Sequence, residues 1–264
     1  MLPVSVYSPA MQTNARPALL QRIGRLLRAK EFLVFFAIGL GVLDFGAPLA
    51  TGWLFRHRSL ATLLHTNNSV AGDAVAGRGW GVIAVAVAYL LVSAFFTAGY
   101  LRSLLGRPHW GPRDARQFSR LFALLALVAA VSWGIGALQG AMGDRLGATG
   151  LLLLVFAVQT IVYVPLLYAE YAIVASNVGV VAALVRSVRT FAANAFVSLL
   201  VLFCLFEVSL ILWQLLPGDA GSAADLGPTV LIHVLVWGSI SFLADVVLLS
   251  VYIDSIERGT LPPN

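Results

Sequence analysis

Six long apolar stretches alternate with short polar connections along the chain. Each is close to, or longer than, the roughly 20 residues that a helix needs to cross a bilayer. None shows the alternation of apolar and polar positions that a transmembrane β-barrel requires. Because backbone polar groups in hydrocarbon must be satisfied within the segment itself, we expect helices. The predicted spans are residues 32–55, 80–101, 118–142, 149–171, 196–216 and 228–252.

Two further stretches have amphipathic helical spacing, one before the first span and one before the fifth. The first carries an apolar face of Leu19, Leu20, Ile23, Leu26 and Leu27 opposite Gln21, Arg22, Arg25 and Arg28. The second sets Val180, Val181, Leu184, Val188 and Phe191 against Arg186, Arg189, Thr190 and Asn194. A basic amphipathic helix beside a span is typical either of an anchor that sets orientation or of a segment that binds anionic lipid. The candidate lipid-headgroup contacts are Arg22, Arg25, Arg186 and Arg189.

Composition agrees with a membrane location and excludes several classes of protein. Of the 264 residues, 59% are hydrophobic and 11% are charged, against a charged fraction of roughly 25% in soluble domains. The mean hydropathy of +0.90 rules out a soluble enzyme and a disordered tail. The net charge of +5 does not indicate nucleic acid, since sixteen of the seventeen basic residues are arginines scattered at the ends of apolar stretches.

The distribution of Lys and Arg between alternate connections predicts the orientation. One side of the membrane collects thirteen of them and the other side four. The positive-inside bias therefore places both termini in the cytoplasm. Basic residues up to Lys30 interrupt any apolar core of a signal peptide, so we expect the first span to be retained. The predicted fold is all-α, a single six-span domain of the cytoplasmic membrane over residues 1–264, with residues 1–30 as a cytoplasmic amphipathic lead-in.

Ionisable residues within the predicted spans are the candidates for a functional site. Asp44, Glu207 and Asp245 lie in the first, fifth and sixth spans, and His233 lies near the outer end of the sixth. A carboxyl at membrane depth is costly and often marks a proton or cation pathway. The alternative is that each protonated carboxyl bonds a polar side chain on a neighbouring helix, which contributes about 1 kcal/mol.

Other motifs add little chemistry. Gly136 and Gly140 form a GxxxG pattern that favours close helix contact with a membrane-protein partner or with a second copy. The single cysteine, Cys204, can form neither an intramolecular disulfide nor a cysteine-based metal cluster. No protease, hydrolase or nucleotide-binding motif is found, and nothing in the sequence calls for a cofactor.

The second half of the chain carries a recognisable pattern. It consists of Gly179, Ala183, Leu184, Arg186, Ser187 and Asn194, followed by Tyr252, Asp254, Arg258 and Gly259. This pattern resembles a poorly characterised group of bacterial multi-spanning proteins, which includes the membrane domain fused to some glycerophosphodiester phosphodiesterases. The chain departs from it at Ser255 and Ile256, where an Arg is expected soon after the Asp. The resemblance implies a six-helix cytoplasmic-membrane protein but brings no agreed activity. We expect no phosphodiesterase barrel, since these residues leave no room for about 250 more, and its catalytic chemistry is not carried over.

Together these features lead us to expect a non-enzymatic bacterial membrane protein that acts through lipids or partner proteins, as a scaffold or accessory of the envelope. One alternative is a transporter or permease component that uses the intramembrane carboxylates. A third is a lipid-modifying membrane enzyme. These alternatives place different demands on the geometry: a transporter needs the carboxylates gathered around a midplane cavity, whereas a scaffold does not.

Overall fold

The computed structural model describes residues 19–43, 79–107, 114–131, 134–135, 162, 164–214 and 223–259. Every regular element within these ranges is a helix, which confirms the all-α prediction. The helices are α1 (Leu19–Ala29), the short 3-10 helix η2 (Glu31–Leu33) continued by residues 34–43, α5 (Gly79–Leu104), residues 114–131, α7 (Ala169–Ser176), α8 (Val180–Ala193), α9 (Ala195–Gln214) and α10 (Ala223–Glu257).

Two of these helices are long and apolar enough to cross a membrane, namely Ile83–Leu104 within α5 and Leu231–Glu257 within α10. The pair Val164–Ser176 and Val180–Ala193 passes the same test together, with a bend of 119° between its halves. Shorter apolar helices cover Glu31–Leu43 and Ala195–Val208. The described part of the chain thus has two or three helices suited to crossing a membrane, which indicates membrane association, and the count of six spans stays a prediction.

The chain breaks between α7 and α8 because of its local sequence. Asn177 adopts a left-handed backbone conformation, with φ of 51°, and ends α7. Asparagine tolerates this conformation better than most residues because its short polar side chain bonds locally. Gly179 follows in an extended conformation and starts α8. A stop and a restart within three residues therefore produce the sharp bend.

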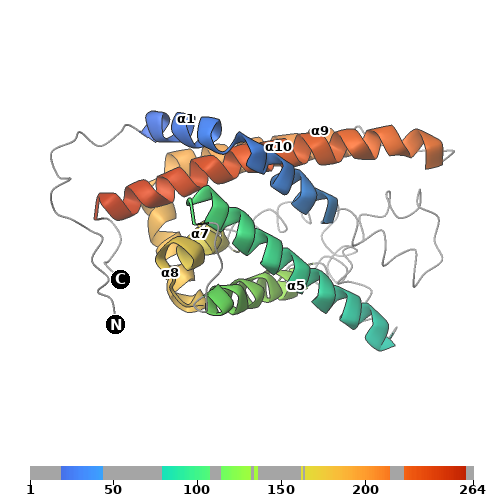
Figure 1. Ribbon diagram of the computed structural model, residues 1–264, viewed down its shortest axis with the longest axis horizontal. Helices are drawn as coiled ribbons and strands as arrows, with labels where there is room; N and C mark the ends of the chain where they lie inside the picture. The colour runs from blue at the N-terminus through green and yellow to red at the C-terminus, as the bar shows by residue number, and fades with distance from the viewer. Residues whose placement is uncertain are drawn as a thin grey trace, which may run out of the picture.

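The helices pack around one apolar core (Figure 1). In Figure 1, α1 (blue) and α9 (orange) both lie along the long helix α10 (red). Residues of both helices contact α10. The apolar face of α1 contributes Ile23, Leu26 and Leu27 to this packing, as its sequence predicts, whereas Leu20 is 80% exposed. Fully buried alanines on α5, α7 and α8 let the backbones approach closely.

The structure of α8 differs in part from the sequence interpretation. That interpretation set an apolar face opposite a polar one and gave Arg186 and Arg189 as candidate headgroup contacts. In the structure, Ala183, Arg186, Ser187 and Thr190 are buried, and the exposed side carries Val181, Val185 and Val188 together with Arg189. Such a distribution suits a lipid environment, where apolar side chains face outward and polar ones are bonded inside the protein.

One close helix contact involves a glycine that the sequence analysis did not single out. A Cβ atom built on Gly238 of α10 would lie 2.5 Å from the Cα of Ile38 and 2.9 Å from its backbone nitrogen. Real side-chain atoms do not come so close to a backbone, so only glycine fits here. Gly136 and Gly140, the predicted contact motif, lie outside the described residues.

Candidate functional site

The predicted intramembrane residues are distributed unevenly over the structure. Asp44 lies outside the described residues. Glu207 is partly exposed on α9 and has no hydrogen-bond or ion-pair partner among the described residues. His233 is partly exposed on α10 and interacts with the backbone of Leu212 on α9. The convergence of the three carboxylates on one cavity therefore stays a prediction, and only Asp245 is seen in a polar cluster.

Asp245 faces two tyrosines from two other helices. The hydroxyl of Tyr171 on α7 donates a hydrogen bond of 2.6 Å to the Asp245 Oδ1 atom. The hydroxyl of Tyr100 on α5 also interacts with this carboxyl. Tyr100 and Tyr171 are 1% and 4% exposed. The cluster therefore joins α5, α7 and α10 inside the apolar core.

A second cluster supports the break between α7 and α8. Arg102, at the end of α5, forms a buried ion pair with Asp114 and donates a 2.9 Å hydrogen bond to the Gln117 Oε1 atom. The Gln117 amide in turn donates to the carbonyl of Val174, at 3.3 Å. That carbonyl belongs to the last turn of α7, where no partner exists within the helix.

Arg120, on the same helix of residues 114–131, completes this support. Its Nη1 atom lies 2.6 Å from the Asn177 carbonyl oxygen and 2.9 Å from the Asn177 Oδ1 atom. The left-handed residue is therefore held through both its backbone and its side chain. We call Arg102, Asp114, Gln117, Arg120 and Asn177 the bend support.

Further hydrogen bonds join α7 to α8, α9 and α10. The Tyr168 backbone N–H donates to the Ser187 Oγ atom at 2.8 Å, and the Tyr168 hydroxyl lies 2.7 Å from the Ser198 Oγ atom. The Ser176 and Tyr252 hydroxyls lie 2.9 Å apart. Hydroxyl groups in an apolar interior are costly when unpaired, so these bonds favour one arrangement of the four helices.

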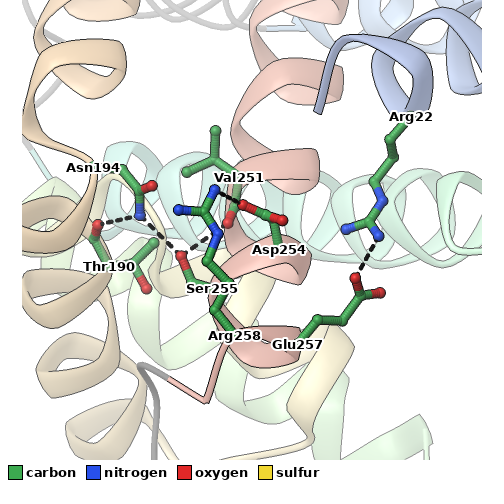
Figure 2. Close-up of polar contacts among 8 residues, drawn as sticks. All are labelled: Arg22, Thr190, Asn194, Val251, Asp254, Ser255, Glu257 and Arg258. Carbon is green, nitrogen blue, oxygen red and sulfur yellow. Dashed lines mark hydrogen bonds and ion pairs between the residues drawn. The ribbon is translucent and has the colours of Figure 1, made fainter. Parts of the chain in front are cut away.

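A third cluster lies at the end of α10, next to the junction of α8 and α9 (Figure 2). Asn194 ends α8, and its Nδ2 atom donates to the Thr190 carbonyl at 3.0 Å and to the Ser255 Oγ atom at 2.9 Å. Figure 2 shows Asn194 between these two partners, with the Arg258 side chain turned back to Asp254 on the same helix. Asn194 therefore caps one helix and ties it to another.

The same end of α10 is also bound to the amphipathic helix α1. Arg22 forms a 2.6 Å ion pair with Glu257 (Figure 2). The Arg22 side chain is 13% exposed and that of Glu257 is 40% exposed, so this pair lies at the edge of the packed helices. Partly solvated pairs of this kind contribute at most about 1 kcal/mol.

The four candidate headgroup contacts divide into two classes. Arg25 and Arg189 are exposed, as a headgroup contact requires. Arg186 is 8% exposed, and Arg22 is bound to Glu257. The structure thus leaves two of the four guanidinium groups open on the surface.

Most of the bend support was missed by the sequence reasoning, which used Arg102 and Arg120 only as charges that set orientation. Their positions in the sequence could have indicated the pair, because Arg102 and Asp114 flank a short connection that contains Gly106 and Pro108. Such a connection brings its two ends together. Among the described residues, no group of three or more His, Cys, Asp or Glu residues could hold a metal ion.

Comparison with known proteins does not identify the chain. No protein-family model, no curated protein and no solved structure matches it.

Proposed function

We propose that this chain is a six-span protein of the bacterial cytoplasmic membrane, with both termini in the cytoplasm, and that it acts as a non-enzymatic scaffold or accessory of the envelope. The observation that carries the proposal is the outward apolar face of α8, with Val181, Val185 and Val188 exposed over buried polar side chains. Exposed apolar side chains also cover α9, including Phe196 and Phe203. Such surfaces are stable in lipid and unfavourable in water.

The polar clusters favour a scaffold over a lipid-modifying enzyme. An enzyme that acts on headgroups needs an open group of donors to hold a phosphate. Here Arg22, Arg102 and Arg258 are each paired with a carboxylate of the chain itself. These pairs stabilise the arrangement of the helices, which is what a scaffold requires.

The proposed relation to the bacterial membrane-domain family has some support in geometry. The residues that carry the resemblance come from two stretches far apart in sequence, and they belong to one connected group of helices. Ser187 bonds Tyr168, Tyr252 bonds Ser176, and Asn194 bonds Ser255. Ser255 stands at the point where the chain departs from the pattern, so here the serine provides a hydrogen-bonding link.

A transporter or permease component is the second candidate. It is favoured by the contact between Asp245 and Tyr171, because Tyr171 lies on one half of the bent pair. Discontinuous helices form the substrate and ion sites of many transporters. Unchanged solute flux through Asp245→Asn protein in proteoliposomes would remove this candidate.

Site-directed labelling tests the proposed location. In a Cys204→Ser background, single cysteines are placed at Ser69, Gly111, Ser222 and Asn264. We expect a membrane-impermeant maleimide to label Ser69→Cys and Ser222→Cys in intact cells, and to label Gly111→Cys and Asn264→Cys only after the membrane is opened, as the charge distribution predicts. Labelling of Asn264→Cys from outside would contradict the proposed orientation.

A further inference from the structure

Three helices that are distant in sequence bring oxygen atoms together around Asp245. Tyr100 comes from α5, Tyr171 from α7 and the carboxyl from α10. Tyr171 already donates to Oδ1, at 2.6 Å. The Tyr100 hydroxyl, also buried, interacts with the same carboxyl. Two phenol hydroxyls therefore face one carboxyl, and both can exchange hydrogen bonds with it.

The hydroxyl of Tyr100 can serve either protonation state of Asp245. A phenol both donates and accepts hydrogen bonds. Beside an ionised carboxylate, Tyr100 can donate its O–H to the carboxylate. Beside a protonated carboxyl, the same oxygen can accept the new O–H of Asp245. Rotation of the Tyr100 hydroxyl thus keeps the Asp245 carboxyl hydrogen-bonded in both its ionised and its protonated state.

We propose that Asp245, Tyr171 and Tyr100 form a binding site for one proton inside the membrane. The proton adds to a carboxylate oxygen of Asp245, and it leaves from the same atom. Tyr171 keeps its bond to the carboxyl in both states, and Tyr100 changes from donor to acceptor. The inference rests on the membrane location proposed above, but on neither the scaffold nor the transporter role.

The helices around the site carry further charged groups. Glu170 on α7 acts on Tyr171 electrostatically. The other helices that pack on α10 carry Arg22, Arg25 and Arg28 on α1, Arg186 and Arg189 on α8, and Glu207 on α9. Arg22 is bound to Glu257, near the far end of α10, and is therefore not the counter-charge of Asp245.

Protonation also alters the link between α7 and α10. A hydrogen bond to an ionised acceptor is roughly twice as strong as one between neutral groups. The bond from Tyr171 to Asp245 therefore weakens when the carboxyl takes up a proton. Because α7 is one half of the bent pair, proton uptake loosens the bent pair from α10.

Infrared difference spectroscopy on the full-length protein in lipid nanodiscs tests the site. Spectra at acid and alkaline pH are subtracted, and a protonated carboxyl gives a carbonyl stretching band. We expect one such band to be lost in Asp245→Asn and kept in Asp254→Asn, the matched control at the end of the same helix. We also expect Tyr171→Phe and Tyr100→Phe each to shift the frequency of this band, because each removes a partner of the carboxyl.

The outcomes separate this inference from the proposed function. If Asp245→Asn fails to fold, the two tyrosine variants still decide, since an unshifted band in both would overturn the site. An Asp245→Asn spectrum equal to that of the wild type would also overturn it. Membrane insertion is measured separately by the maleimide labelling above. Normal insertion without the band refutes only the proton site, whereas failed insertion refutes the proposed membrane role.

Discussion

Replacing Asp114 with alanine is expected to destabilise the folded protein by about 3–5 kcal/mol, the cost of breaking a buried ion pair from one side. Asp114 and Arg102 are both buried, with side chains 10% and 11% exposed. The variant leaves the Arg102 guanidinium inside the protein without the carboxylate that it pairs with. The loss is measured as the shift in the free energy of unfolding in detergent, followed by circular dichroism.

Two controls test whether the loss of stability comes from the burial of the charge pair. The double variant Arg102→Met with Asp114→Ala removes both charges, and we expect it to regain much of the lost stability. Asp254→Ala breaks the more exposed pair with Arg258, whose side chain is 52% exposed, and should cost about 1 kcal/mol or less. Equal losses for Asp114→Ala and Asp254→Ala would show that the bend support does not depend on a buried charge pair.

Replacing Gly238 with alanine is expected to cost about 1–3 kcal/mol, the usual penalty for overpacking a close contact. The new methyl group would lie 2.5 Å from the Ile38 Cα atom, so the backbones of α10 and of residues 34–43 must move apart. Gly238→Leu should cost more, because the helices must then separate further. Thermal unfolding in detergent measures both losses.

Gly41→Ala is the matched control for this contact. A Cβ atom at Gly41 would meet its nearest neighbour, the Val234 carbonyl, at 3.8 Å, which is ordinary van der Waals contact. Alanine also favours a helix over glycine by about 1 kcal/mol. We expect Gly41→Ala to be neutral or stabilising. If Gly238→Ala were equally harmless, α10 and the helix of residues 34–43 would not be in close contact.

The long helices could be predicted because their signal is local. Residues 80–101 and 228–252 were predicted as spans, and α5 and α10 cover them. An uninterrupted apolar run of this length has few stable alternatives to a helix in a membrane. The bend at Asn177 was less predictable, since it depends on Arg120 and Gln117 from a helix more than 50 residues earlier.

The face of α8 could not be derived from its amphipathic pattern. Periodicity shows that a helix has two unlike sides, but the side that turns inward depends on what surrounds the protein. The sequence interpretation gave both arginines of α8 as candidate headgroup contacts. In the structure Arg186 is buried, whereas Arg189 is exposed on the side that carries Val181.

Only one member of the candidate site, Asp245, could be predicted from the sequence. The cost of a carboxyl at membrane depth singled out Asp245 in advance. Its partners could not be found in this way, because Tyr171 lies 74 residues away along the chain and tyrosines are frequent in apolar segments. Side-chain partners across helices follow from the packing of the helices, which the sequence pattern does not specify.

Spin labels on α8 test the central claim, that this helix turns its apolar face to lipid. In the Cys204→Ser background, labels are placed at Val185 and Val188 on the outer face, with Ala183 on the inner face as control. In lipid bilayers, collision with oxygen, which concentrates in hydrocarbon, should dominate at both valines, and Ala183→Cys should be shielded from oxygen and from a water-soluble nickel chelate alike. Preferential collision of both valine labels with the nickel chelate would contradict the account.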